Sequence, residues 1–425
     1  MTTDATHRAI NAVWRIESPK LIAGLARLVR DVGLAEELAQ DALVTALEHW
    51  PETGVPDNPG AWLMTTARNR ALDQLRQRKM AARKLEDVGR DLEARTARGA
   101  EEIEAVIEAA IDDDVGDDLL RLVFTACHPV LSTEARVALT LRLLGGLTTD
   151  EIARAFLVPE PTVAQRIVRA KRALADARVP FEVPRGAELA ARLASVLEVI
   201  YLVFNEGYSA TAGDDWMRPA LCEDALRLGR ILAELAPREP EVHGLVGLME
   251  IQASRTAART GPGGAPVLLF DQNRALWDRL LIQRGQTAIE RATALRLPPG
   301  PYLLQAAIAA CHARAATPAD TDWPRIVGFY ELLTRVAPSP VVALNRAVAV
   351  SMASGPAAGL ALVDALVQEP ALAGYHLLPS VRGDLLFKLG RTTEARVEFE
   401  RAAALTRNAR EKAFLRERAA ACGRN

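Results

Sequence analysis

The 425-residue chain lacks the features that disulfide-rich, metal-binding and membrane proteins need. Its four cysteines lie far apart with no C-x-x-C spacing, so neither a disulfide framework nor a zinc site is indicated. No run of about 20 apolar residues could span a bilayer, and no N-terminal segment has the pattern of a secretion signal. The sequence has no Gly-rich phosphate loop and no combination of nucleophile, base and orienting residue. We therefore expect a cytoplasmic protein with no enzymatic activity, no cofactor and no bound metal.

The sequence also shows little sign of β structure. Residues 185–425 contain no alternating pattern of any length, are rich in Ala and Leu, and are interrupted by Pro and Gly at the spacing of helical hairpins. We predict an all-α fold with several domains. The net charge of −2 hides blocks of opposite sign, because residues 86–118 carry thirteen acids and three bases between two basic segments.

Residues 145–172 have the pattern of a helix-turn-helix. Gly145 and Gly146 end one helix, and Thr149 is placed to cap the next one. Leu157, Val158 and Pro159 then form the turn, and Pro161 suits the first turn of a second helix. That helix has an apolar stripe of Val163, Ile167, Ala170 and Leu174. Its other face carries Thr162, Gln165, Arg166, Arg169 and Arg172.

Polar and cationic side chains on such a helix can read base edges and contact phosphates. We therefore expect duplex DNA as the partner. A helical hairpin with a solvated basic face would show the same pattern.

A second basic segment, residues 61–84, carries seven Lys or Arg from Arg68 onward and one acid, Asp73. The helical spacing places Ala61, Met64, Ala71 and Leu75 on one side, and Asn69, Asp73 and Arg76 on another. This mixture of amide, carboxylate and guanidinium suits hydrogen bonding to bases. The preceding residues 51–60 are rich in Pro, Gly and Asn and predict an irregular loop that could hold an unstacked base. A solvated helix after a surface loop is the alternative.

Residues 33–50 predict an acidic amphipathic helix. Leu34, Leu38, Ala42 and Ala46 form its buried side, which leaves Glu37, Gln40, Asp41 and Glu48 outside. An acidic face beside a DNA-binding helix suits a basic protein partner better than phosphates. Ordinary solvation of a surface helix would also explain these charges.

In this order, the segments EELAQDAL, AWLMTTARNRALDQLR and GGLTTDEIARAFLVPEPTVAQRIVRAKRAL resemble regions 2 and 4 of extracytoplasmic-function (ECF) sigma factors. These proteins are bacterial RNA polymerase subunits that direct promoter recognition. The resemblance covers nearly all of residues 10–178. It implies core RNA polymerase and promoter DNA as partners. The lack of a membrane-spanning run separately indicates no membrane partner.

The resemblance also implies roles for individual residues. Glu37, Gln40 and Asp41 would face the clamp helices of the largest polymerase subunit. The minus-10 promoter element would lie near Asn58, Asn69, Arg70, Asp73 and Arg76. The minus-35 element would be contacted by Thr162, Gln165, Arg166, Arg169 and Arg172.

We expect sigma region 2 at residues 1–80, an acidic linker at 81–116, sigma region 4 at 117–180 and a C-terminal domain at 185–425. Near the C-terminus, six residues fall on the small and aromatic positions of a 34-residue tetratricopeptide (TPR) repeat: Gly383, Leu386, Gly390, Ala395, Phe399 and Ala402. Gly355 precedes Gly390 by 35 residues. Several C-terminal segments also resemble the TPR-like extension of one ECF subgroup, which implies a regulatory domain with a protein or peptide partner.

Two other interpretations stay open at this point. A stand-alone transcription regulator, in which the TPR-like part senses a ligand, would explain residues 117–425 but gives no purpose to the two preceding helices. A scaffold protein with basic surfaces would bind no DNA. The sequence also leaves open whether the C-terminal domain supports activity or blocks the DNA-binding helices.

Overall fold

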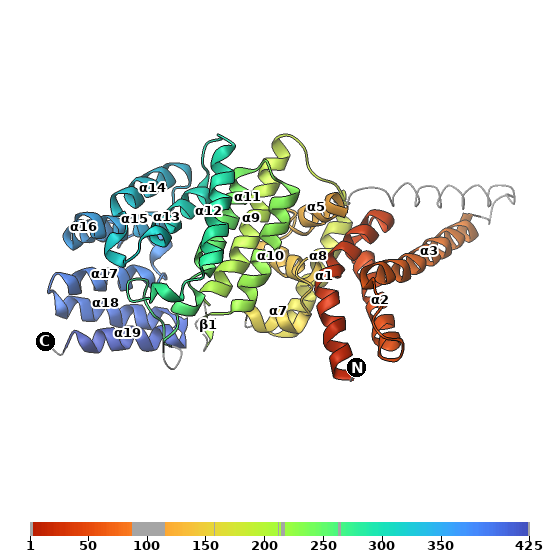
Figure 1. Ribbon diagram of the computed structural model, residues 1–425, viewed down its shortest axis with the longest axis horizontal. Coiled ribbons are helices and arrows are strands. Elements are labelled where there is room, and N and C mark those ends of the chain that lie inside the picture. Colours follow the sequence, from red (N-terminus) through yellow and green to blue (C-terminus); the bar gives the residue numbers. More distant parts are fainter. Residues whose placement is uncertain are drawn as a thin grey trace. The chain divides into compact units, whose positions relative to one another are not determined.

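The computed structural model describes residues 3–86, 115–156, 158–210, 212–213, 217–261 and 265–423. It divides into two compact units, residues 1–199 and 200–425, and the boundary falls inside helix α9 (Ala187–Tyr208). Helices make up nearly all of the regular structure, so the predicted all-α fold is confirmed (Figure 1). The two strands, β1 (Ala212–Gly213) and β2 (Arg407–Asn408), form one short parallel pair.

The first unit begins with an N-terminal bundle of three helices, α1 (Thr3–Val29), α2 (Val32–Thr53) and α3 (Pro59–Glu86). It continues with a helix-turn-helix bundle of four helices, α5 (Val115–Ala126), α6 (Thr133–Leu143), α7 (Thr149–Phe156) and α8 (Glu160–Asp176). Both bundles bury the apolar sides of their helices, because most of the stability of a helix in a protein comes from packing of its apolar face. The bundles also contact one another, through α1 with α5 and through α2 with α8.

The start of α2 follows from its sequence. The Asp31 carboxylate accepts a hydrogen bond from the Leu34 N–H at 3.1 Å and so caps the helix. The predicted stripe of Leu34, Leu38, Ala42 and Ala46 is buried. The helix runs through Thr53, however, so the predicted loop at 51–60 shrinks to residues 54–58. Residues 87–114, most of the predicted acidic linker, lie outside the described residues.

The second unit is a succession of antiparallel helices after the end of α9 (Figure 1). They are α10 (Pro219–Leu235), α11 (Pro240–Ala253), α12 (Arg279–Ala294), α13 (Pro301–Arg314), α14 (Trp323–Val336), α15 (Pro340–Ser354), α16 (Pro356–Asp364), α17 (Leu377–Lys388), α18 (Thr392–Leu405) and α19 (Ala409–Ala421). Short 3-10 helices lie in the connections at Thr256–Ala258, Arg274–Leu276, Pro318–Asp320 and Pro370–Leu372.

The 35-residue spacing of Gly355 and Gly390 is explained by two successive helical hairpins. Gly355 separates α15 from α16 with φ 97°, and Gly390 separates α17 from α18 with φ 77°. Both backbones are in the left-handed region, where glycine carries no steric penalty. Within the second hairpin Gly383 faces Phe399, and a Cβ at position 383 would lie 3.0 Å from that ring. The pattern read from the sequence is therefore that of a packed helical hairpin.

Residues 205–208, NEGY, have a pattern that favours a helix stop with Gly207 as its left-handed cap, but Gly207 has a different role in the structure. Helix α9 continues through Tyr208, and a Cβ at position 207 would lie 2.7 Å from the backbone nitrogen of Cys222. The glycine therefore allows α10 to approach α9 closely.

No helix in the described part of the chain is long and apolar enough to cross a bilayer.

Candidate nucleic-acid interface

The predicted helix-turn-helix is formed by α7 and α8, which contact one another. Thr148 rather than Thr149 caps α7, because the Thr148 hydroxyl accepts the Glu151 N–H at 3.1 Å and the Glu151 carboxylate accepts the Thr148 N–H at 2.8 Å. This reciprocal pair is a capping box. Val158 and Pro159 lead into α8, and Leu157 lies outside the described residues. Pro161 occupies the first turn, as the sequence predicts.

Helix α8 is divided into a buried stripe and an exposed polar face. The stripe contains all four residues predicted for it, Val163, Ile167, Ala170 and Leu174. On the other face Gln165, Arg169 and Arg172 are exposed, and Thr162 and Arg166 are partly exposed. Val168 joins this face with 64% of its surface exposed, although the sequence reasoning did not single it out. The five side chains predicted for the minus-35 element thus share one accessible surface.

Helix α3 carries the residues predicted for the minus-10 element. Asn69, Arg70, Asp73 and Arg76 are all exposed, and Asp73 pairs with Arg76 at 3.5 Å. The buried side of α3 contains Leu63, Ala67 and Ala71. Ala61, which the helical spacing assigned to the apolar side, is exposed at the start of the helix.

Asn58 lies where α3 begins. Its side-chain oxygen accepts a hydrogen bond from the Ala61 N–H at 3.1 Å, so the residue helps to fix the first turn. Asn58 is exposed, as are the neighbouring Asp57 and Gly54. Its amide nitrogen points to no partner among the described residues, which leaves it available to a base or a phosphate.

The exposed face of α2 combines acidic and apolar side chains. Glu37 and Asp41 are exposed and Gln40 is partly exposed, as the sequence predicts. Val44 and Leu47, on the next turns, expose 51% and 37% of their surfaces. Sequence reasoning missed these two residues, although their spacing from Gln40 could have revealed them. A polar face with apolar residues at its centre is suited to a protein partner.

The same surface is linked to α3 by charge. The Arg70 guanidinium lies 3.6 Å from the Asp41 carboxylate and donates a hydrogen bond to the Thr45 hydroxyl at 2.8 Å. Arg70 and Asp41 are both exposed to solvent, so this pair contributes little to stability. It does bring a residue predicted for DNA beside one predicted for the polymerase.

Glu36 forms a buried ion-pair cluster that joins the two bundles. Only 2% of its surface is exposed. Its carboxylate accepts from the Arg142 guanidinium of α6 at 2.6 Å and pairs with the Lys171 ammonium of α8. Gln40 also donates to this carboxylate. Because a buried charge is tolerated only with partners, these contacts specify how α2 meets α6 and α8.

A second charge cluster lies between α1 and α5. The Asp118 carboxylate, which is buried, pairs with Arg27 at 3.0 Å and with Arg121 at 2.7 Å. Two carboxylates, one from each bundle, therefore form ion pairs across the junction of the bundles.

The first part of α9 packs on the helix-turn-helix bundle. The Arg192 guanidinium donates to the Phe124 carbonyl at 2.7 Å, and the Ser195 hydroxyl donates to the Cys127 carbonyl at 2.8 Å. These carbonyls lie at the end of α5, where helical partners are missing. Arg136 of α6 also donates to the Ser195 hydroxyl and pairs with Glu198 at 3.3 Å.

Cys127 and His312 belong to the two Cys-His dipeptides of the sequence, at 127–128 and 311–312, and burial shifts the pKa of each side chain. Burial raises the pKa of the Cys127 thiol to about 11, and the thiol lies 3.3 Å from the Thr140 hydroxyl. Burial also lowers the pKa of His312 to about 4, with further lowering by Arg255 and Arg274. Within the described ranges, no group of three His, Cys, Asp or Glu side chains could hold a metal ion.

Three protein-family models match the chain. Sigma-70 region 2 matches residues 14–80, and sigma-70 region 4 matches residues 121–174. These matches contain α2 with α3 and α7 with α8, which carry the surfaces described above. A family of unknown function, DUF6596, matches residues 192–293, which begin in α9.

Some known proteins resemble the chain over nearly its whole length, and others resemble only about a third of it. An uncharacterized protein, R00370, of Rhizobium meliloti is 46% identical over 399 residues, which cover 94% of this chain and 92% of the relative. The ECF RNA polymerase sigma factor SigL of Mycobacterium tuberculosis is 30% identical over 149 residues, or 35% of this chain and 76% of the relative. The ECF RNA polymerase sigma factor SigK of Mycobacterium ulcerans is 30% identical over 155 residues, or 35% of this chain and 75% of that relative.

Proposed function

The chain belongs to the ECF RNA polymerase sigma factors, and on that premise we propose that it binds core RNA polymerase and directs promoter recognition and transcription initiation. The observation that carries this proposal is the pair of exposed polar faces on α3 and α8. Each face lies within a different matched sigma region, and the two occur in the expected order. We propose that the chain acts in the cytoplasm, where bacterial promoters are.

We assign the minus-10 element to α3 and the minus-35 element to α8. On α3 the contacts come from Asn69, Arg70, Asp73 and Arg76, with Asn58 at the helix start. On α8 they come from Thr162, Gln165, Arg166, Arg169 and Arg172. Exposure of these side chains supports the assignment, and Arg169 forms no ion pair with a described residue that would compete with DNA. Arginine is well suited to this role because its guanidinium can bind guanine in a bidentate manner.

We assign the polymerase contact to α2, through Glu37, Gln40 and Asp41, with Val44 and Leu47 as its apolar centre. The charges would steer a basic partner surface, and the apolar residues would provide burial. Within the chain we propose sigma region 2 at residues 1–80, a linker at 81–116 and sigma region 4 at 117–180. The helical domain that follows would modulate their activity, through a protein or peptide partner.

The minus-10 contact is assigned to the N-terminal bundle and the minus-35 contact to the helix-turn-helix bundle, so both can be made together only if the bundles separate. The two promoter elements are separated by about 25 base pairs, which is about 85 Å along B-form DNA. Contacts of 2.6 Å between α2 and α6 keep the bundles directly against one another. We propose that the contacts between the bundles represent the free protein, and that the polymerase separates them.

Run-off transcription with purified core polymerase tests the proposed function. We expect a specific transcript only when core enzyme and the chain are both present. Arg169→Ala should reduce that transcript about fivefold or more, because a base contact contributes about 1–3 kcal/mol. Arg185→Ala, which removes an exposed charge outside α8, serves as the matched control. A transcript that is independent of the chain, or equal losses in both variants, would contradict the proposal.

A further inference from the structure

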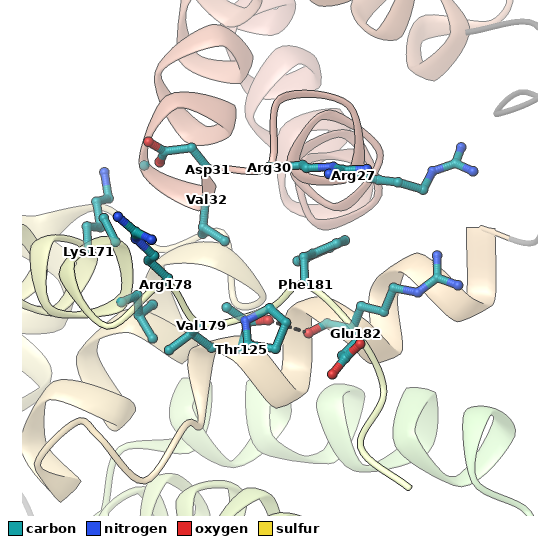
Figure 2. A pocket seen from close by; sticks show the side chains of 15 residues that line it. Arg27, Arg30, Asp31, Val32, Thr125, Lys171, Arg178, Val179, Phe181 and Glu182 are labelled. Atoms are coloured by element: carbon teal, nitrogen blue, oxygen red, sulfur yellow. Dashed lines mark hydrogen bonds between the residues drawn. The ribbon is translucent and has the colours of Figure 1, made fainter. Parts of the chain in front are cut away.

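A cavity of about 790 Å³ lies between the N-terminal bundle and the helix-turn-helix bundle. The surfaces proposed for DNA and for the polymerase do not include it. Its walls come from the end of α1, the start of α2, the side of α5, the end of α8 and the segment after α8 (Figure 2). This volume lies within the range of sites that hold small molecules.

The lining of the cavity has a cationic part and an apolar part. Five cationic side chains line it: Arg27, Arg30, Arg121, Lys171 and Arg178. Val32, Val179 and Phe181 provide apolar surface, and Figure 2 shows Phe181 between the end of α1 and the side chains below it. Only two carboxylates, Asp31 and Glu182, belong to the lining.

Two of these cations are available to a ligand. Arg27 and Arg121 share Asp118, and Lys171 pairs with Glu36. Arg30 and Arg178 are exposed and form no ion pair with any residue that the structure describes. Of the two lining carboxylates, Asp31 is engaged as the cap of α2. The α2 N-terminus adds backbone N–H groups, which favour an anion.

Arg30 and Arg178 also share an unusual backbone conformation. Their φ angles are 54° and 48°, in the left-handed region that glycine and asparagine adopt more readily. Among the described residues other than glycine, only Arg296 also has a positive φ, and it lies in the second unit. Each of these three arginines follows the end of a helix, where a left-handed residue commonly ends the last turn. Arg30 and Arg178 are the two of them that line the cavity.

We propose that this cavity binds a small anion with several phosphate groups. Guanidinium groups bind phosphate through paired, charge-assisted hydrogen bonds, and Arg30 and Arg178 supply one such group from each bundle. Phe181 offers a surface on which a base can stack, so the class includes nucleotides as well as inorganic polyphosphates. A ligand bound there would tie the two bundles together.

Calorimetric titration of the full chain, without polymerase or DNA, tests this site independently of the proposed function. The probes are inorganic tripolyphosphate and ATP, at about 0.15 M salt so that weak surface attraction is screened. The test variant is Arg30→Asn with Arg178→Asn, because asparagine tolerates the left-handed backbone and should preserve the fold. The control is Arg185→Asn with Arg284→Asn, which removes two exposed charges elsewhere.

We expect one binding site per chain, at least about tenfold weaker binding in the test variant, and binding within about twofold of wild type in the control. Equal affinities for the two probes would identify phosphate as the only recognised group. Tighter binding of ATP that Phe181→Ala removes would identify a nucleotide. Equal losses in test and control variants, several weak sites, or no binding of either probe would overturn the proposal.

Discussion

Arg169 and Lys171 lie two residues apart on α8 but have different surroundings. Lys171 turns towards α2, where its ammonium pairs with the buried Glu36 carboxylate. Arg169 is exposed and belongs to the face proposed for DNA. The helical spacing predicted the position of Arg169, because that depends only on residues near it in the sequence. The ion pair between Lys171 and Glu36 could not be predicted from helical spacing, because more than a hundred residues separate the two in the sequence.

His312 provides a test at the level of one side chain. Burial, with Arg255 and Arg274, lowers its pKa from 6.5 to about 4 in the folded chain. As the pH falls from 6.5 towards 4, His312 therefore becomes protonated in the unfolded chain while it stays neutral in the folded chain. The folding free energy contributed by neutral His312 is present above pH 6.5 and is lost across this window.

We expect wild type to lose about 2 kcal/mol more stability than His312→Phe between pH 7 and pH 5. Phenylalanine retains a ring beside Trp323, whose centroid lies 5.2 Å from that of His312. Urea unfolding followed by tryptophan fluorescence at both pH values measures the difference. The same loss in both proteins would show that His312 does not resist protonation.

Helices α7 and α8 show what could be predicted from local sequence. The apolar stripe of α8 and the Pro161 position are confirmed, because both follow from helical periodicity and backbone chemistry. The predicted cap of α7, Thr149, was wrong by one residue, because Thr148 is the cap in the structure. Both residues have the same chemistry, and only the position of Glu151 distinguishes them. The prediction that Gly207 ends α9 as a left-handed cap was wrong for another reason. Its role depends on a contact with α10, which is not local in the sequence.

Helix α9 shows where the sequence could not place a boundary. A change in composition near residue 185 suggested that a new domain begins there. In the structure residues 187–199 belong to the first compact unit, and Arg192 and Ser195 bind carbonyls at the end of α5. These hydrogen bonds connect residues 68 positions apart, so no local pattern reveals them.

Two truncations separate the effect of α9 from that of the second unit. The chain ending at Arg178 should unfold several degrees below the chain ending at Val199, because the two α5 contacts contribute about 2 kcal/mol together. Thermal unfolding monitored by circular dichroism measures this difference. Equal midpoints would mean that α9 does not stabilise the helix-turn-helix bundle.

The longer fragment also tests the proposed modulation by the C-terminal domain. Lost promoter transcription from a chain that ends at Val199 and remains folded would mean that the second unit supports activity. Transcription above that of the full chain would instead mean that the second unit blocks the DNA-binding helices. Unchanged transcription and unchanged polymerase affinity would contradict modulation in either direction.

Across the first unit, the two bundles share charged contacts that must break if both promoter elements are read. Glu36 and Asp118 each join helices of different bundles. A disulfide placed at the same junction would prevent their separation. A Cβ at Gly33 would lie 3.8 Å from the Lys171 Cβ, which is the usual Cβ separation of a disulfide.

We expect oxidised Gly33→Cys with Lys171→Cys to lose promoter transcription and to regain it on reduction. Each single variant under the same oxidant provides the control, and the four native cysteines are buried. Run-off transcription before and after reduction measures the effect. Full activity of a quantitatively cross-linked protein would show that the bundles need not separate.

The most direct test of a core-dependent sigma factor is DNase footprinting of a responsive promoter with the chain alone, with core polymerase alone, and with both. We predict protection of the minus-10 and minus-35 elements together only when both proteins are present, because two small interfaces bind tightly only when held at a fixed spacing. A specific footprint made by the chain alone and unchanged by core polymerase would contradict the account and indicate a stand-alone regulator.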